Sequence, residues 1–306
     1  MPRPPVAEPV PVARRISALV IACHPEPTAL VTVLTSLLAL SAGRGWGTVW
    51  VTAAVLAGQL SVGWTNDYRD RDLDRAARRM DKPLARTSPS GAYDAALRPT
   101  TVRTAAIAAL AACVPLSLAS GIGFTAAHLT AIAFAMAYTA RLKSTLLSVV
   151  PYAVAFGLLP AAVALGLPTP RWPPVWSIAA GALIGAGGHF TQALPDIPTD
   201  RTLGIHGLPQ AVGQPASGAL AALLLLAANA TVALGPGRPG PLQLAGAALA
   251  ALLAAGISIA AVMHRPKLAY RLTLAAAAVT VLAFLASGHS LAAGPAIQGL
   301  AGPFSR

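Results

Sequence analysis

The sequence predicts an all-α fold, a polytopic membrane bundle of about nine transmembrane helices. Hydrophobic residues make up 55% of the chain and charged residues only 10%. Soluble domains carry roughly 25% charged residues, so this chain has too little polar surface to be solvated by water alone. In addition, its apolar stretches recur at lengths close to the roughly 20 residues that cross a bilayer as a helix.

The first four expected spans lie in the N-terminal half. The first, 27–43, follows a Pro-Glu-Pro sequence, and the second, 46–64, ends where a run of acidic and basic residues begins. The third and fourth, 102–121 and 123–140, are separated only by the Gly-Ile-Gly sequence at 121–123. Because glycine is a strong helix breaker, we place a turn there.

The remaining expected spans are divided by Pro-rich and Gly-rich breaks. "LPTPRWPP" (167–174) and "GPGRPGP" (235–241) are two such breaks, since neither sequence can continue a helix. The five spans are 145–166, 174–194, 210–234, 241–262 and 268–288. We therefore treat residues 1–306 as one integral-membrane domain, with 1–26 as a cytoplasmic lead-in.

The basic residues orient these spans. With the N-terminus in the cytoplasm, the 22 Lys and Arg residues fall on the cytoplasmic side with few exceptions, which are Arg44, Arg171, Arg238 and Arg306. This bias follows the positive-inside rule. It places the connections 65–101 and 195–209 at the inner face of the cell membrane.

The net charge of +12 has two possible meanings. It could indicate nucleic-acid binding, but in so apolar a chain it is better explained by membrane topology and by attraction to the anionic cytoplasmic leaflet. We therefore expect membrane lipid, and no nucleic acid, among the partners. The sequence does not indicate an oligomeric state.

The carboxylates gather beside two of the spans. After the second span, Asn66, Asp67, Asp70 and Asp74 follow one another at spacings of three and four residues. These spacings place side chains on one face of a helix. A surface helix could carry such a stripe as a solvated face neutralised by nearby arginines, but polar stripes beside membrane segments are costly and are usually functional.

A second acid pair, Asp196 and Asp200, follows the sixth span. Pro195 and Pro198 flank Asp196, so we expect a broken helix or turn there instead of a continuous helix face. Two oxygen-rich clusters on one side of the membrane suit Mg²⁺, which binds a few carboxylates together with water and phosphate oxygens. The sequence therefore predicts a magnesium-dependent diphosphate site.

These motifs resemble those of the UbiA superfamily of intramembrane prenyltransferases. "NDYRDRDLD" (66–74) is similar to its N-D-x-x-D-x-x-x-D motif and "DIPTD" (196–200) to its D-x-x-x-D motif. "YTARLKS" (138–144) resembles the segment after the fourth span, which extends the match across most of the chain. His24 stands where many members have arginine before a proline.

The resemblance implies a central cavity that opens sideways to lipid, in which Mg²⁺ binds and ionises a prenyl diphosphate. The isoprenyl cation then passes to a small acceptor, usually aromatic. By position, the catalytic acids would be Asp70, Asp74, Asp196 and Asp200. One metal would be held by Asn66, Asp70 and Asp74 with Asp67 close by, and the other by Asp196 and Asp200. The diphosphate would contact Tyr138, Lys143 and Arg141.

The acceptor and the final step remain open. Gln192 and His189 precede the second acid pair and could hydrogen-bond an acceptor, although His189 could equally be a satisfied core histidine. A terpene cyclase acting on a prenyl diphosphate alone would carry the same two acid motifs. A transporter or a lipid phosphotransferase fits less well, because the D-G-x-x-A-R signature of the latter is absent.

Overall fold

The computed structural model describes residues 11–86, 97–286 and 291–297. Within those ranges the regular secondary structure is all helical, and one isolated bridge between Arg171 and Ala296 is the only β-type pairing. The prediction of an all-α protein is confirmed.

The long helices follow the order of the expected spans, except that the first helix precedes the first span and lies in the expected lead-in, 1–26. They are α1 (Val12–Ala22), α2 (Pro25–Ser41), α3 (Thr48–Ala76), α4 (Pro99–Ala119), α5 (Ile122–Ala140), α6 (Val150–Leu165), α7 (Val175–Ala193), α10 (Gln214–Leu234), α11 (Pro241–Val262) and α12 (Pro266–Ala286). The short elements are α8 (Ile197–Thr202), α9 (Leu208–Val212), η1 (Gly45–Gly47), η2 (Leu142–Ser144), η3 (Leu146–Val149) and η4 (Leu291–Ala293).

Proline marks the start of several helices. Pro25, Pro99, Pro241 and Pro266 are the first residues of α2, α4, α11 and α12. Proline suits this position because its missing N–H would have no partner in the first turn and its φ angle is already helical. The Pro and Gly breaks in the sequence therefore become the ends of the bundle.

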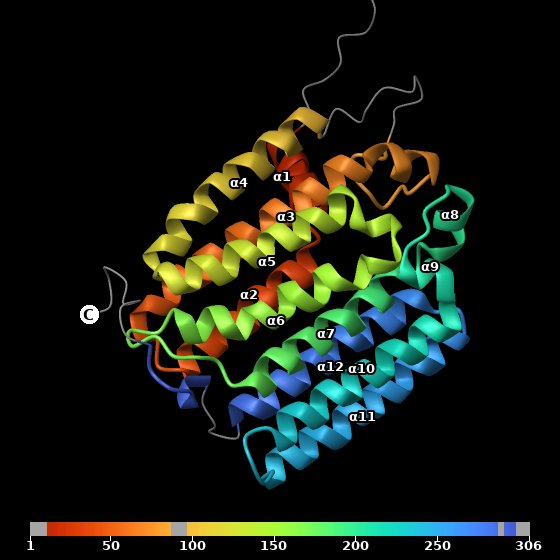
Figure 1. Cartoon of the computed structure of the whole chain (residues 1–306). Helices are drawn as coiled ribbons and strands as arrows, with labels where there is room; N and C mark the ends of the chain where they lie inside the picture. Colours follow the sequence, from red (N-terminus) through yellow and green to blue (C-terminus); the bar gives the residue numbers. More distant parts are fainter. Residues whose placement is uncertain (1–10, 87–96, 287–290, 298–306) are drawn as a thin grey trace, which may run out of the picture.

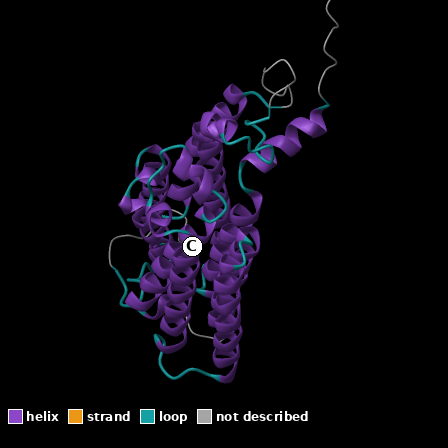
Figure 2. Cartoon of the chain, turned by 90° about the vertical axis from the view of Figure 1, so that its right-hand side faces the viewer, coloured by secondary structure: helices purple, strands orange, loops and turns teal. Residues whose placement is uncertain are grey.

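Helices that follow one another in the chain pack side by side (Figure 1). α12 also packs against α2 and α7, so the end of the chain returns to its beginning. Seen after a 90° turn, most helices run along a common direction (Figure 2). α2, α6, α7 and α12 consequently surround the interior of the bundle.

The outer surface of the bundle is apolar. Ile107, Leu223 and Leu252 are 58%, 61% and 71% exposed, and many other large apolar side chains also point outward. In water this surface would be unfavourable, whereas in a bilayer it meets lipid chains of the same polarity. The structure therefore supports an integral membrane protein.

Fewer than nine of the described helices are by themselves long and apolar enough to cross a membrane. Among the described helices, six are long and apolar enough to span a membrane, or seven if α1 and α2, which meet at 67°, count as one span. α2 alone has 17 residues, and α3 and α7 carry many small and polar residues. Polar positions are expected in membrane helices that line a cavity, so the composition of α3 and α7 does not contradict the expected spans. The count of nine crossings stays a prediction.

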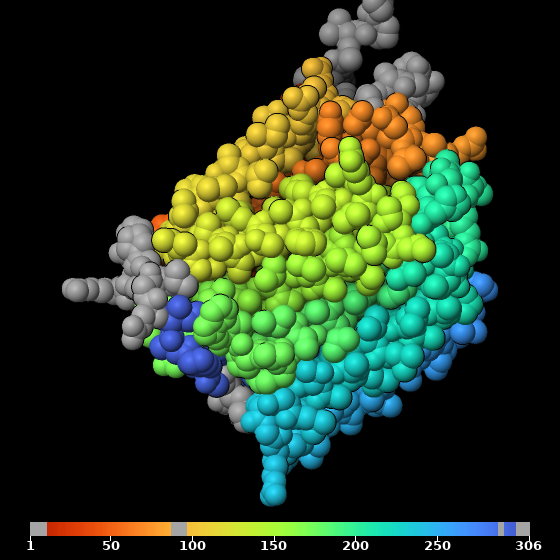
Figure 3. All heavy atoms as spheres, in the orientation of Figure 1, coloured from red at the N-terminus to blue at the C-terminus, as the bar shows by residue number. Residues whose placement is uncertain are grey.

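Both acid motifs lie at one end of the bundle, which we call the acid end. The residues that follow α3, in orange, and the α8–α9 segment, in teal, meet there on the surface (Figure 3). The guanidinium of Arg79 bridges them, with its Nη1 atom 2.8 Å from Asp196 Oδ1. Residues 87–96 of the connection 65–101 lie outside the described residues.

Candidate functional site

The first acid motif lies on the last turns of α3, as predicted. The helix runs unbroken to Ala76, so Asn66, Asp70 and Asp74 remain one turn apart and line a single cavity. Asp70 and Asp74 are buried, and Asn66 Nδ2 donates to Asp70 Oδ2 at 3.2 Å. Three of the four side chains of the expected stripe therefore line one cavity, and their role as metal ligands stays a prediction.

Asp67 lies to the side of that cavity. It is 1% exposed and accepts a hydrogen bond of 2.9 Å from Lys82 Nζ. Lys82 also lies 3.0 Å from His24 Nε2. The structure therefore places Asp67 in a buried ion pair, and its role as a metal ligand stays a prediction.

His24, at the position where the family commonly has arginine, does not supply the missing cation. Burial lowers its pKa to about 3, and the charges of Lys82 and Arg79 add to this effect. This environment favours the neutral form of His24. Lys82 brings a positive charge to the same wall of the cavity.

The second acid motif begins a new helix. α7 ends at Ala193 and α8 starts at Ile197, so the predicted break is confirmed. The expectation that the two acids do not share a helix face is wrong, because the Asp200 amide donates to the Asp196 carbonyl at 2.7 Å across one helical turn. Both carboxylates line the same cavity as Asp70 and Asp74.

Arg79 joins the two acid motifs. Its Nη1 atom lies 2.8 Å from Asp196 Oδ1 and 3.7 Å from Asp74 Oδ1. Arg79 and Lys82 were not among the predicted site residues, since they follow the end of α3. The chain reverses there at Arg78, whose φ of 53° is unusual for a residue other than glycine.

Lys143 reaches the cavity from η2, between α5 and α6. Its Nζ atom is 2.6 Å from Asp70 Oδ2, and the Tyr138 ring lines the cavity beside it. Arg141, the other basic residue predicted here, is exposed and is not among the residues that line the cavity. The structure thus brings together two of the three predicted diphosphate contacts.

Burial tunes the charges at the acid end. It raises the pKa of Asp74 to about 6, although Lys82 and Arg79 oppose the shift. Burial also raises the pKa of Asp200, and the Asp196 charge adds to this, while Gln210 donates to Asp200 at 2.7 Å and lowers it. For Lys143, burial lowers the pKa, but Asp70 and the other acids outweigh it and the pKa is raised. Cations are therefore favoured in this cavity.

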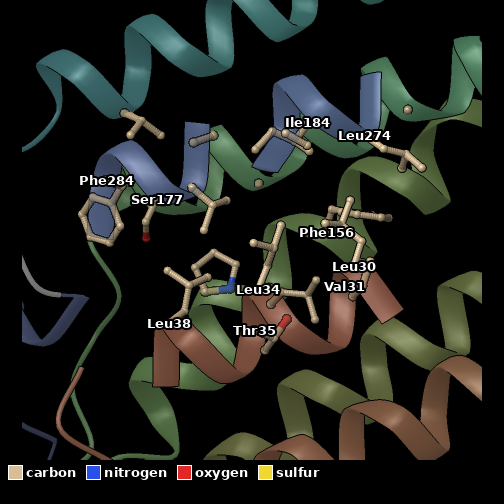
Figure 4. Close-up of a pocket in the computed structure, with 18 of the residues that line it drawn as sticks. Leu30, Val31, Leu34, Thr35, Leu38, Phe156, Ser177, Ile184, Leu274 and Phe284 are labelled. Atoms are coloured by element: carbon tan, nitrogen blue, oxygen red, sulfur yellow. The ribbon is translucent and has the colours of Figure 1, made fainter. Parts of the chain in front are cut away.

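Two cavities meet inside the bundle. The polar one, at the acid end, has a volume of about 570 Å³. A narrower apolar groove of about 150 Å³ continues between α2, α6, α7 and α12. Pro27, Gln192 and Tyr270 line both. In Figure 4, side chains of α2, among them Leu30, Leu34 and Leu38, face those of the opposite helices across the groove, among them Ile184, Ser177 and Phe284.

Gln192 lies at the junction of the two cavities, as the acceptor hypothesis requires. Its Oε1 atom accepts a hydrogen bond of 2.8 Å from the Tyr152 hydroxyl. His189 is 2% exposed and does not line either cavity. Its Nε2 atom lies 3.0 Å from the Ser148 hydroxyl, which fits a core histidine better than an acceptor ligand.

The donor set fits magnesium shared with a substrate. Within the described ranges, no three Asp, Glu, His or Cys side chains are gathered closely enough to hold a metal by themselves. Mg²⁺ is usually held by one or two carboxylates while water and substrate phosphates complete its octahedron. Asp70 and Asp74 on one wall, with Asp196 and Asp200 on the other, offer such partial sets.

Comparison with known proteins agrees with this geometry. The model of the UbiA prenyltransferase family matches residues 29–288. No curated protein sequence matches the chain. Among solved structures, a UbiA homologue from Aeropyrum pernix K1 without ligand superimposes with a TM-score of 0.65 at 20% identity, covering 91% of this chain and 99% of that one.

Two further structures are of a UbiA homologue from Archaeoglobus fulgidus. The form bound to DMAPP and Mg²⁺ has a TM-score of 0.66 at 16% identity, covering 90% of this chain and 98% of that one. The form bound to GPP and Mg²⁺ has a TM-score of 0.64 at 18% identity, covering 90% and 99%. At these identities the likeness is one of fold.

Proposed function

This chain belongs to the UbiA prenyltransferase family, and we propose that it transfers the isoprenyl group of a prenyl diphosphate to a small aromatic acceptor. The observation that carries the proposal is the continuity of an acid-lined polar cavity with an apolar groove through Pro27, Gln192 and Tyr270. A prenyl diphosphate has the same division into a charged head and an apolar tail.

The polar cavity suits the diphosphate head. Lys143 and Lys82 both line it and present ammonium groups to an anionic ligand. Asp70, Asp74, Asp196 and Asp200 would hold Mg²⁺, which when bound stabilises negative charge on the departing diphosphate. Groups that bind the leaving diphosphate more strongly than the intact substrate lower the barrier to C–O cleavage.

The apolar groove suits the isoprenyl tail. Its walls are side chains such as Leu30, Leu34, Phe156 and Leu274, so burial of an alkyl chain there is favourable by roughly 25 cal/mol per Å². The groove also keeps water away from an allylic cation, which would otherwise be hydrolysed. Tyr152, which lines the groove near its polar end, offers an aromatic ring that can stabilise the cation.

The acceptor would approach at the junction of the two cavities. Gln192 is exposed there, and its carboxamide is positioned by the Tyr152 hydroxyl. A fixed carboxamide can orient a hydroxyl or amine so that an electron-rich ring meets the cationic carbon. This arrangement favours transfer to a separate molecule over cyclisation.

Product analysis tests the proposal. Purified protein is incubated with Mg²⁺ and labelled geranyl, farnesyl and geranylgeranyl diphosphate, with and without a panel of aromatic acceptors, and products are identified by mass spectrometry. We expect diphosphate release and prenylated product only when an acceptor is present. Efficient formation of a cyclic hydrocarbon without acceptor would overturn the transfer proposal in favour of a terpene cyclase.

A substitution at the junction tests the acceptor site. The Gln192→Leu variant keeps the side-chain volume but removes the carboxamide, so we expect the KM for acceptor to rise at least about fivefold. The affinity for a non-reactive prenyl thiolodiphosphate should change less than about twofold. Equal weakening of both ligands would show that Gln192 acts on the whole cavity and not on the acceptor.

We also propose that the acid end faces the cytoplasm, as the distribution of Lys and Arg indicates. Single cysteines replace Ser144 at the acid end and Arg238 at the opposite end, two exposed positions, in a background lacking Cys23 and Cys113. In intact cells a membrane-impermeant maleimide should label only the cysteine at position 238. Labelling only at 144 would invert the orientation, and labelling of both would contradict the odd number of spans between them.

A further inference from the structure

The first helix, α1, carries a row of exposed apolar side chains, which we call the α1 stripe: Val12, Ile16 and Val20. They are 70%, 59% and 49% exposed and follow one another at intervals of four residues. This spacing places them on one face of the helix. The face that packs against the bundle carries the buried Ala18 and Ala22 instead. The α1 stripe therefore points away from the rest of the chain.

α1 is fixed to α3 just before the first acid motif. The Trp64 indole N–H donates to the Leu19 carbonyl at 2.9 Å. Where α1 ends, the Cys23 backbone lies so close to Gly63 that a Cβ atom at this glycine would collide with it. Ile21, on the last turn of α1, lines the polar cavity. α1 is therefore a packed part of the acid end, and its exposed stripe is not the result of loose attachment.

The length and direction of α1 suit the surface of a membrane better than its interior. With 11 residues, α1 is far shorter than the roughly 20 residues that cross a bilayer. It meets α2 at an angle of 67°. A helix so strongly inclined to a membrane helix lies closer to the membrane plane than to the direction of crossing. Short amphipathic helices with this orientation bury their apolar face at the boundary between headgroups and acyl chains.

Basic residues surround the α1 stripe. Arg15 on α1 is exposed, and so are Arg98 and Arg103 at the start of α4. Their neighbours Leu97 and Val102 pack in one apolar cluster with α1, so the start of α4 lies beside this helix (Figure 1). Three arginines therefore gather around an apolar face. Anionic lipid headgroups attract arginine side chains near a membrane surface.

A lipid surface fits this face better than a protein partner does. The outer face of α4 is itself apolar, with Ile107, Leu110 and Leu118 exposed. In a bilayer that face meets acyl chains, so the α1 stripe beside it continues an existing contact with lipid. The three arginines also complement the charge of anionic headgroups.

We propose that α1 is an interfacial anchor that lies in the headgroup region of the membrane at the acid end. The α1 stripe contacts acyl chains, while Arg15, Arg98 and Arg103 bind the headgroups of anionic phospholipids. Because Ile21 of the same helix lines the polar cavity, the membrane surface supports one wall of the candidate site. This contact with lipid does not depend on which reaction the site performs.

Fluorescence quenching tests the position of the α1 stripe. Ile16 and Ser17 are both exposed and lie about 100° apart around the helix. Ile16→Cys and Ser17→Cys, each in a background lacking Cys23 and Cys113, are labelled with bimane and reconstituted in nanodiscs at one copy per disc. Lipids brominated in their acyl chains should quench the label at position 16 at least about twofold more than the label at position 17. Aqueous iodide should show the reverse order.

Three other outcomes would overturn the anchor. Equal quenching of both labels by iodide would place the α1 stripe in water, and equal quenching of both by brominated lipid would place the whole helix in the hydrocarbon. Protection of position 16 from both quenchers would show that protein covers it. That protein would be a second copy if protection appeared only in discs with two copies, and the same chain if it appeared in discs with one.

Lipid selectivity tests the arginines and leaves both cysteines in place. Spin-labelled phosphatidylglycerol and phosphatidylcholine are compared for contact with the full chain in reconstituted membranes. The wild type should prefer phosphatidylglycerol at least about threefold at low salt, and replacement of Arg15, Arg98 and Arg103 by Gln should lower this preference at least about twofold. High salt should weaken the wild-type preference, because it screens charges at the surface.

A matched pair of single substitutions separates the proposed site from net charge. Arg103→Gln and Arg238→Gln each remove one exposed charge, the first beside α1 and the second at the opposite end of the bundle. Arg103→Gln should lower the preference for phosphatidylglycerol, and Arg238→Gln should leave it unchanged. An unchanged preference in the triple variant, or equal losses in the two single variants, would overturn the assignment of anionic headgroups to α1 and α4.

Discussion

Replacement of Asp70 by Asn should lower kcat/KM at least about a thousandfold, or roughly 4 kcal/mol of transition-state stabilisation. Asp70 faces the polar cavity from α3, and its Oδ2 atom receives both Lys143 Nζ at 2.6 Å and Asn66 Nδ2 at 3.2 Å. The amide has the same shape but no charge, so it can neither hold Mg²⁺ as a carboxylate does nor anchor the lysine. Initial rates with the prenyl diphosphate that gives the highest wild-type turnover measure the loss.

The same helix offers a matched control. Asp72 has a side chain that is 65% exposed, pairs with Arg71 at 3.1 Å and does not line the cavity. The Asp72→Asn variant should retain activity within about twofold, because exposed ion pairs contribute little. Elution of both variants at the wild-type position in size-exclusion chromatography would show that they fold.

If Asp70→Asn kept more than about a tenth of the wild-type rate, this carboxylate would lower the activation barrier by less than roughly 1.4 kcal/mol. It would then be a structural partner of Lys143 and not part of an essential metal site. The Mg²⁺ dependence of thiolodiphosphate binding gives a readout independent of turnover. It should be lost in the Asp70 variant and kept in the Asp72 variant.

Helical periodicity accounts for the part of the site that the sequence predicted. Asn66, Asp70 and Asp74 remain on one face because nothing between Thr48 and Ala76 interrupts α3. Pro195 and Pro198 indicated a break before the second acid pair, and the chain does start a new helix there. In both cases the information is local, since spacing within one or two turns fixes the geometry.

Tertiary turns account for the part that the sequence did not predict. Arg79 and Lys82 lie beyond the end of α3, where the chain reverses at Arg78 and brings their side chains back to the acids. Helical spacing carries no information on such a reversal. The same holds for Asp67, which shares its helix with Asp70 but turns toward Lys82 and leaves the cavity wall.

The contact between the Trp176 and Phe284 rings shows the same limit over a longer distance. Trp176 and Phe284 stand at opposite ends of different expected spans, and each alone is an ordinary apolar residue of a membrane helix. Their contact depends on how α7 and α12 cross in the finished bundle. A single sequence predicts the helices far better than the contacts between them, because those contacts depend on packing of distant segments.

Lys143 and Arg141 provide the sharpest test of the diphosphate site, since they lie two residues apart and were both predicted to bind it. Lys143 enters the cavity and pairs with Asp70, whereas Arg141 is exposed outside it. We expect Lys143→Gln to lower kcat/KM about a hundredfold or more, the loss typical of a donor aimed at developing negative charge. Arg141→Gln should stay within about threefold of wild type.

Further measurements on Lys143 variants separate the effect of its charge from the effect of its position. A lysine that binds the leaving diphosphate should affect kcat at least as strongly as KM, because its interaction strengthens as the C–O bond breaks. Lys143→Arg keeps the charge but changes the geometry of the donor, so it should recover part of the loss. The reverse order, with Arg141→Gln impaired and Lys143→Gln active, would move the diphosphate to the outer side of η2. That result would separate Asp70 from the leaving group and would assign the polar cavity to the acceptor instead.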